Sequence, residues 1–131
     1  MTAVATSILI VEDDPIIALE LEQVLRQQGY RIAGKAHSAV QAIDRLAAGG
    51  IDFAILDINL GSGQSGIDVA RIIHRKYELP YIFLTAFADE HTLTAAQEQA
   101  PYGYLVKPFQ TPTLLSTISV ALSNYRRLRK G

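Results

Sequence analysis

The sequence contains no cysteine, no apolar run long enough to cross a bilayer and no marked excess of charge of either sign. Without cysteine, a disulfide framework and a thiolate metal site are both excluded, and a reducing compartment fits best. A transmembrane helix would need about 18 consecutive apolar residues. The first seven residues, MTAVATS, also lack the charged segment of a secretory signal. We therefore expect a cytoplasmic protein that does not contact the membrane.

The charge balance gives no reason to expect a nucleic-acid partner. Lys and Arg together number 12 and Asp and Glu number 13, which leaves a net charge of -1 at pH 7. Binding to a phosphate backbone requires a basic surface. The basic tail at residues 126–130 is explained by the favourable placement of cations at the C-terminal end of a helix. We expect no nucleic-acid binding by this domain.

The length and composition fit one domain. The chain has 131 residues, of which 49% are hydrophobic, and it shows no internal repeat or linker. A chain of this size buries one hydrophobic core. We predict a single domain over residues 1–131, with its core between about residues 7 and 125 and a basic helix end at 126–131.

Strand-like and helix-like segments alternate along the chain. Short apolar runs rich in branched residues predict five strands, at residues 7–11, 30–36, 52–56, 80–84 and 103–106. The segments between them, and the one after the last strand, have apolar residues at helical spacing. The segment 89–100 is only weakly apolar, so we expect its helix to be the least firmly packed. Alternating units of this kind predict a doubly wound α/β fold with a parallel sheet and helices on both faces.

In a doubly wound fold, ligands bind beyond the carboxyl ends of the strands. The side chains expected at this edge are carboxylates, a hydroxyl and an ammonium group: Glu12, Asp13, Asp14, Asp57, Thr85 and Lys107. Oxygen ligands suit a hard divalent cation, and a hydroxyl and an ammonium group suit the oxygens of a phosphoryl group. The sequence therefore predicts a site at this edge for a cation and a phosphoryl group together.

Three adjacent carboxylates, Glu12, Asp13 and Asp14, require an explanation. At about 4 Å, two such charges repel each other by about 4 kcal/mol at an effective dielectric constant near 20. Asp14 is followed by Pro15, which is typical of a helix N-cap with proline at the first helical position. We therefore assign Asp14 a structural role as a helix N-cap. Glu12 and Asp13 remain as candidate ligands of the cation.

In this order and spacing, the residues resemble the receiver domain of two-component response regulators over essentially the whole chain. The matching features are an acidic pair after the first strand, an Asp after the third, a Thr after the fourth, and a Lys-Pro dipeptide preceded by an aromatic residue at the fifth. In this sequence they are Glu12 with Asp13, Asp57, Thr85, Lys107 with Pro108, and Tyr104.

The resemblance implies a flavodoxin-like (βα)5 fold with strand order 2-1-3-4-5 and a specific chemistry. Asp57 would be the phosphoacceptor, assisted by Lys107 and Thr85. Mg²⁺ would be bound directly by Asp13 and Asp57, through water by Glu12, and by the backbone carbonyl of Asn59. A cis peptide bond between Lys107 and Pro108 is also implied.

The resemblance further implies partners and a switch. The phosphoryl donor would be a sensor histidine kinase or a phosphotransfer protein. Thr85 and Tyr104 would transmit phosphorylation to the surface of the fourth helix, fifth strand and fifth helix, which would contact a downstream protein or an attached output domain. A homodimer is compatible with this scheme. The domain would not be an enzyme in the usual sense, but it would assist its own phosphorylation and dephosphorylation.

A few residues fit the resemblance less well or stand outside it. Phe87 is bulkier than the residues usual in the loop after the fourth strand, and APYG places Pro101 and Tyr102 at the entry to the fifth. These residues shape either a private partner surface or local loop packing. The three histidines share no ligand-like spacing and are predicted to lie on the surface: His37, His74 and His91.

Three other functions remain as alternatives. A phosphatase of the haloacid-dehalogenase type would carry an Asp-x-Asp nucleophile motif after the first strand, and EDDP lacks that spacing. A flavin- or nucleotide-binding module would need a phosphate-binding loop rich in Gly, Ser or Thr at the same place. An interaction domain that is never phosphorylated would have no need of the acceptor set.

Overall fold

The structure, a computed structural model, describes residues 5–61, 63–86 and 90–130. Phe87 and the side chain of His91 lie outside the described part of the chain. Five strands are seen: β1 (Ser7–Val11), β2 (Arg31–Ala36), β3 (Phe53–Asp57), β4 (Tyr81–Thr85) and β5 (Gly103–Val106). The helices are α1 (Pro15–Gln27), α2 (Ala39–Ala48), α3 (Gly66–Ile72), α4 (Glu90–Gln97) and α5 (Thr111–Lys130).

All strand pairs are parallel, and the sheet order is β2-β1-β3-β4-β5. The predicted flavodoxin-like α/β fold and its strand order are therefore confirmed. Each crossover between successive strands is a helix, which accounts for the parallel pairing. Two strands are shifted by one residue from their predicted positions, so that Asp57 and Thr85 are the last residues of β3 and β4 rather than the first residues after them.

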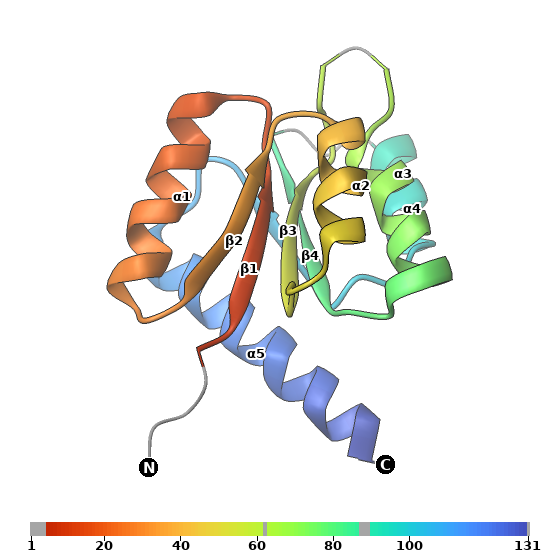
Figure 1. Cartoon of the computed structure of the whole chain (residues 1–131). Helices are drawn as coiled ribbons and strands as arrows, with labels where there is room; N and C mark the ends of the chain where they lie inside the picture. The colour runs from red at the N-terminus through yellow and green to blue at the C-terminus, as the bar shows by residue number, and fades with distance from the viewer. Residues whose placement is uncertain (1–4, 62, 87–89, 131) are drawn as a thin grey trace.

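Helices cover both faces of the sheet (Figure 1). Alternate residues of β1 point to opposite faces. Ile8 and Ile10 pack in one core cluster with apolar residues of α1 and α5. Leu9 and Val11 pack in the other with residues of α2 and α3. Because β3 and β4 are buried on both faces, they read in the sequence as continuous apolar runs.

Local signals fix where the helices begin. The Asp14 side chain accepts hydrogen bonds from the backbone N–H groups of Ile16 (2.9 Å) and Ile17 (3.4 Å), and Pro15 is the first helical residue of α1. Ser38 caps α2 by accepting from the N–H of Gln41. The predicted cap at Asp14 is thus present. It accounts for one of the three adjacent carboxylates.

Helix α3 departs from the sequence expectation, whereas α4 agrees with it. Helix α3 continues as a π-helical turn, η1 (Ile73–Tyr77), which was not predicted. Helix α4 has only eight residues. Among the described residues it contributes Ala96 alone to the buried core, in line with the weak packing expected of it. Within the described part of the chain, no helix combines the length and the apolar character that a membrane span requires.

Candidate functional site

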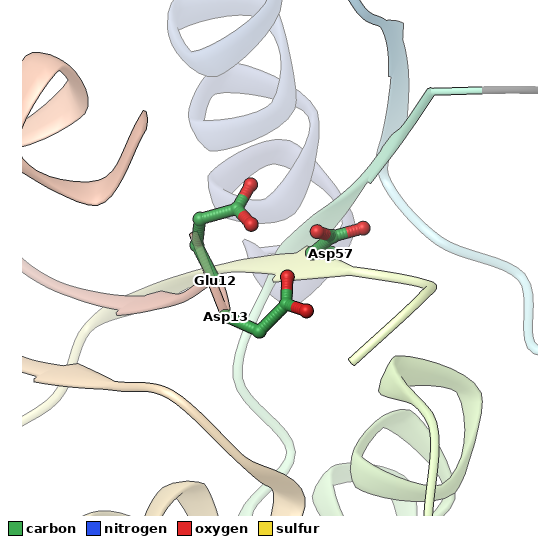
Figure 2. A group of neighbouring side chains, drawn as sticks. All are labelled: Glu12, Asp13 and Asp57. Atoms are coloured by element: carbon green, nitrogen blue, oxygen red, sulfur yellow. The ribbon is translucent and has the colours of Figure 1, made fainter. Parts of the chain in front are cut away.

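Three carboxylates meet at the carboxyl edge of the sheet (Figure 2). Glu12 and Asp13 directly follow β1, and Asp57 ends β3, which is the neighbour of β1 in the sheet. One oxygen from each of the three carboxylates lies within 4.8 Å of the others. Glu12 and Asp57 are only 0% and 2% exposed, whereas Asp13 faces the solvent. The edge therefore carries two buried acids and one accessible acid within reach of a single ion.

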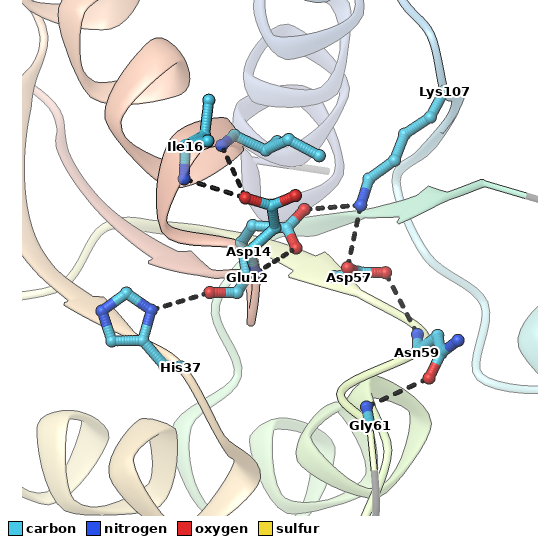
Figure 3. Close-up of polar contacts among 9 residues, drawn as sticks. Glu12, Asp14, Ile16, His37, Asp57, Asn59, Gly61 and Lys107 are labelled. Carbon is cyan, nitrogen blue, oxygen red and sulfur yellow. Dashed lines mark hydrogen bonds and ion pairs between the residues drawn. The ribbon is translucent and has the colours of Figure 1, made fainter.

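Lys107 reaches into this cluster from the end of β5 (Figure 3). Its Nζ atom lies 2.6 Å from Glu12 Oε1 and donates a hydrogen bond of 3.0 Å to Asp57 Oδ2. The peptide bond between Lys107 and Pro108 is cis, as the resemblance implied. The contact with Asp57 was expected. The shorter one with Glu12 was not, because the resemblance assigned Glu12 only a water-mediated contact with the metal.

The backbone around Glu12 is held on several sides. Its N–H donates to the carbonyl of Ala36 in β2 at 2.9 Å, and its Oε2 accepts from the N–H of Asp14 at 3.0 Å. Its own carbonyl oxygen lies 2.9 Å from Nδ1 of His37. The residue therefore has little freedom to move away from the carboxylate cluster.

Asp57 is held by the loop that follows it. Its Oδ1 accepts from the N–H of Asn59 at 3.1 Å, and the Asn59 side chain accepts from the N–H of Gly61 at 3.1 Å. The loop then returns so tightly that a Cβ atom on Gly66 would lie 2.1 Å from the Asp57 carbonyl oxygen. Only glycine can occupy this position without displacing the end of β3.

The charges of the cluster are not balanced. Burial, followed by hydrogen bonding with Asp57, raises the pKa of Glu12. Partial burial and the neighbouring Glu12 raise the pKa of Asp13. Burial by itself lowers the pKa of Lys107, but its hydrogen bonds with Glu12 and Asp57 outweigh that effect and raise it. One ammonium group faces three carboxylates, so a divalent cation would relieve the remaining repulsion.

Thr85 and Tyr104 are diagonal neighbours on the adjacent strands β4 and β5. Phe83 pairs with Tyr104 and Thr85 with Val106 in the register of β4 and β5, so that Thr85 and Tyr104 project from the same face of the sheet. Thr85 is buried, with 4% of its surface exposed. The Tyr104 hydroxyl is buried and has no hydrogen-bond partner among the described residues. Burial also raises the pKa of Tyr104.

A contact of His37 with the acidic cluster was not predicted. His37 was placed on the surface, and it is indeed exposed, yet its imidazole contacts the backbone of Glu12. The signal that could have found it is positional. His37 directly follows β2 and Glu12 directly follows β1, and these two strands are neighbours in the predicted order.

Pro101 and Tyr102 lie at the entry to β5, at the opposite end of the sheet from the carboxylates. The Tyr102 ring makes an edge contact with Tyr125 of α5, with the ring centroids 5.7 Å apart. The backbone N–H of Tyr102 donates a hydrogen bond to the carbonyl of Tyr81. These contacts tie the loop before β5 to α5 and β4.

Comparison with known proteins points to one family. The sequence model of the response regulator receiver domain matches residues 8–119. Transcriptional regulatory protein PdtaR of Mycobacterium tuberculosis is 33% identical over 126 residues, which cover 96% of this chain and 61% of PdtaR. Phyllosphere-induced regulator PhyR of Methylorubrum extorquens is 36% identical over 119 residues, covering 90% of this chain and 44% of PhyR.

A solved structure agrees with these relatives. The solution structure of the PhyR receiver domain from Erythrobacter litoralis superimposes with a TM-score of 0.80 at 37% identity, covering 90% of both chains. The chain spans less than two thirds of the length of PdtaR and less than half of PhyR. The fold and the sequence similarity agree, and the chain belongs to the response regulator receiver domain family.

Proposed function

We propose that this receiver domain accepts a phosphoryl group on Asp57 from the phosphohistidine of a sensor histidine kinase or a phosphotransfer protein, in a reaction that depends on Mg²⁺. The observation that carries the proposal is the placement of Asp57. Its carboxylate lies at the carboxyl edge of the sheet, within 4.8 Å of a Glu12 and an Asp13 oxygen, and is bonded to Lys107 at 3.0 Å.

The donor set fits Mg²⁺. Carboxylate oxygens from three residues converge, and two of these residues have a raised pKa that a nearby cation would lower again. Asp13 and Asp57 would bind the ion directly, Glu12 would bind it through water, and Asn59 would offer its backbone carbonyl. The ion, once bound, screens the carboxylates and helps to neutralise the oxygens of the incoming phosphoryl group.

The chemical step requires mainly that the reacting groups are correctly positioned and that the charge on the phosphoryl oxygens is stabilised. A carboxylate oxygen of Asp57 attacks phosphorus, a new O–P bond forms, and the P–N bond to the donor imidazole breaks. The electron pair of the broken bond stays on the imidazole nitrogen. The imidazole leaves as a neutral ring when its other nitrogen carries a proton, and otherwise it takes up one proton from water. Lys107, already 3.0 Å from Asp57, pairs with an oxygen of the transferred group. Hydrolysis later returns the carboxylate and releases inorganic phosphate.

Phosphorylation would then act on the surface formed by α4, β5 and α5. The acyl phosphate adds charge and strong hydrogen-bond acceptors, toward which the Thr85 hydroxyl moves. Tyr104, on the same face of the neighbouring strand, fills the space that Thr85 leaves. The two states differ in their contacts to the phosphoryl group, which is the condition for a population shift. The altered surface would bind a downstream protein or an attached output domain.

The first test uses acetyl phosphate as a small donor. The protein is incubated with acetyl phosphate and Mg²⁺, and its intact mass is measured over time. We expect a gain of one phosphoryl group that is lost on treatment with hydroxylamine, absent in EDTA and absent in Asp57→Asn. Steady hydrolysis of a simple phosphate ester should not be seen. Such turnover would instead favour the phosphatase alternative.

The second test addresses the switch. A Thr85→Ala variant should still accept the phosphoryl group, but its α4, β5 and α5 amide resonances should shift less on phosphorylation than those of the wild type. Thr6→Ala, at a threonine that precedes β1 and lies outside α4, β5 and α5, is the matched control. If Thr85→Ala responds to phosphorylation as fully as the wild type does, Thr85 does not transmit the signal.

A further inference from the structure

The imidazole of His37 forms a bond between the end of β2 and the start of the acidic cluster. Its Nδ1 lies 2.9 Å from the carbonyl oxygen of Glu12 (Figure 3). A carbonyl oxygen can only accept a hydrogen bond, so Nδ1 carries the proton and donates it. The tautomer of His37 follows from its partner.

This bond completes the fixation of the Glu12 backbone. The Glu12 N–H donates to the carbonyl of Ala36, the residue just before His37, at 2.9 Å. Both polar groups of the Glu12 main chain are therefore bonded to two consecutive residues at the end of β2. His37 is in turn anchored to α2, because its N–H donates to the side chain of Gln41 at 2.7 Å.

The Glu12 carbonyl belongs to the same rigid peptide group as the N–H of Asp13. Fixing that group sets the direction in which the Asp13 side chain leaves the backbone. Asp13 needs this help more than its two neighbours in the cluster, because Glu12 and Asp57 are buried while Asp13 is exposed. Packing holds the first two carboxylates in place. The position of the third depends on its backbone.

We propose that His37 is a positioning residue for Asp13, whose imidazole holds the Glu12–Asp13 peptide group so that the Asp13 carboxylate lies ready for a cation. This inference rests on the function proposed above. Partners of metal ligands typically change metal affinity by about 10- to 100-fold when removed. Because His37 acts through the backbone rather than on a ligand atom, we expect about a three- to tenfold loss of Mg²⁺ affinity when it is truncated.

The test compares three substitutions by isothermal titration with Mg²⁺. Asn carries its amide nitrogen at the same distance from Cβ as Nδ1 of histidine, whereas Gln carries it where Nε2 would lie. His37→Ala and His37→Gln should therefore weaken Mg²⁺ binding, and His37→Asn should restore most of it. Val40→Ala, an exposed position on α2, is the control and should leave the affinity unchanged.

Two further readouts separate positioning from a general structural role. At saturating Mg²⁺, His37→Ala should accept the phosphoryl group from acetyl phosphate at nearly the wild-type rate, because only the ion's affinity is affected. In ¹⁵N spectra of the wild type at a pH where His37 is neutral, the ring should appear as the Nδ1–H tautomer. If His37→Ala proves unfolded, the comparison of His37→Asn with His37→Gln decides.

Unchanged Mg²⁺ affinity in a folded His37→Ala, or equal affinities of the Asn and Gln variants, would overturn the inference while the proposed function stands. A lower thermal midpoint with no change in Mg²⁺ affinity would likewise leave His37 a merely structural residue. If the wild type itself neither binds Mg²⁺ nor accepts a phosphoryl group, the proposed function fails and this inference with it.

Discussion

Lys107 Nζ lies 3.0 Å from Asp57 Oδ2 although 50 positions in the sequence separate the two residues. The same ammonium group contacts Glu12, whose side chain is fully buried. The strand order makes this possible, because it brings the ends of β1, β3 and β5 to one edge of the sheet. Among the described residues, Lys107 is the only positively charged side chain within salt-bridge distance of the acidic cluster.

Replacing Lys107 by Met should destabilise the protein in the absence of divalent ions. Two buried carboxylates would lose their shared partner, which we expect to cost about 1–3 kcal/mol in the free energy of unfolding. Urea denaturation measures this cost, and added Mg²⁺ should recover part of it. Lys76→Met, at an exposed lysine of η1, is the matched control. Equal stability of the two variants would contradict the proposed coupling of Lys107 to the cluster.

Replacing Asp13 by Asn should stabilise the protein when no divalent ion is present. Burial and Glu12 raise the pKa of Asp13, so the folded state binds a proton more readily than the unfolded state. As the pH rises above the ordinary value of 3.8, the carboxylate therefore becomes a cost to folding. At pH 7 we expect a melting temperature about 2–5 °C higher for Asp13→Asn.

The same substitution should remove the response to Mg²⁺. The wild type is expected to melt at a higher temperature when Mg²⁺ is added, since an ion that binds only the folded state stabilises it. Asp13→Asn should show little or no such rise. A full rise in the variant would exclude Asp13 from the cation site.

Replacing Gly66 by Ala should damage the site through the backbone. The added Cβ would lie 2.1 Å from the Asp57 carbonyl oxygen, and relief would require the end of β3 or the start of α3 to move. We expect a loss of about 1–3 kcal/mol in stability, and slower phosphoryl transfer to Asp57. In the control, Gly34→Ala, the atoms nearest the new Cβ belong to the flexible Arg45 side chain, the first of them at 3.2 Å. The two variants should differ clearly in denaturation and in labelling rate.

Glu22 offers a test of pH dependence away from the site. Its carboxylate binds Lys35 at 2.7 Å and Arg26 at 3.0 Å, and these two cations lower its pKa. The resulting stability is present above the ordinary value of 4.5 and is lost as the pH falls through the lowered value of the folded state. Glu22→Gln should cost about 0.5–1 kcal/mol at pH 7. Its stability curve should converge with that of the wild type in acid, and a constant gap across the pH range would count against the ion pairs.

Much of the fold could be read from the sequence because its signals are strong. Buried parallel strands are short branched apolar runs, and the predicted ranges agree with β1 and β5 and lie within one residue of the other three. The small displacement of β3 and β4 has a physical cause. Asp57 and Thr85 are polar, so apolar patterning ends before them, yet both remain in the hydrogen-bonded sheet and are buried.

The features that the sequence did not predict depend on local backbone geometry and on side-chain conformation. The segment 73–77 has two apolar residues, Ile73 and Tyr77, and their spacing of four fits an ordinary α-helix, so the sequence did not predict η1. The contact of Lys107 with Glu12 depends on the path of a flexible side chain. The strand order places His37 near Glu12, but the backbone bond between them also depends on the rotamer of the His37 side chain, which the sequence does not give.

The most direct test of the central claim is to locate the phosphoryl group by peptide mapping after labelling with acetyl phosphate and Mg²⁺. The acyl phosphate is first reduced with borohydride, which converts the modified aspartate to homoserine and leaves a stable mark. We expect this mark at Asp57 in the wild type and none at Asp13. A modification at any other residue, or none at all in protein shown to be folded and to bind Mg²⁺, would contradict it.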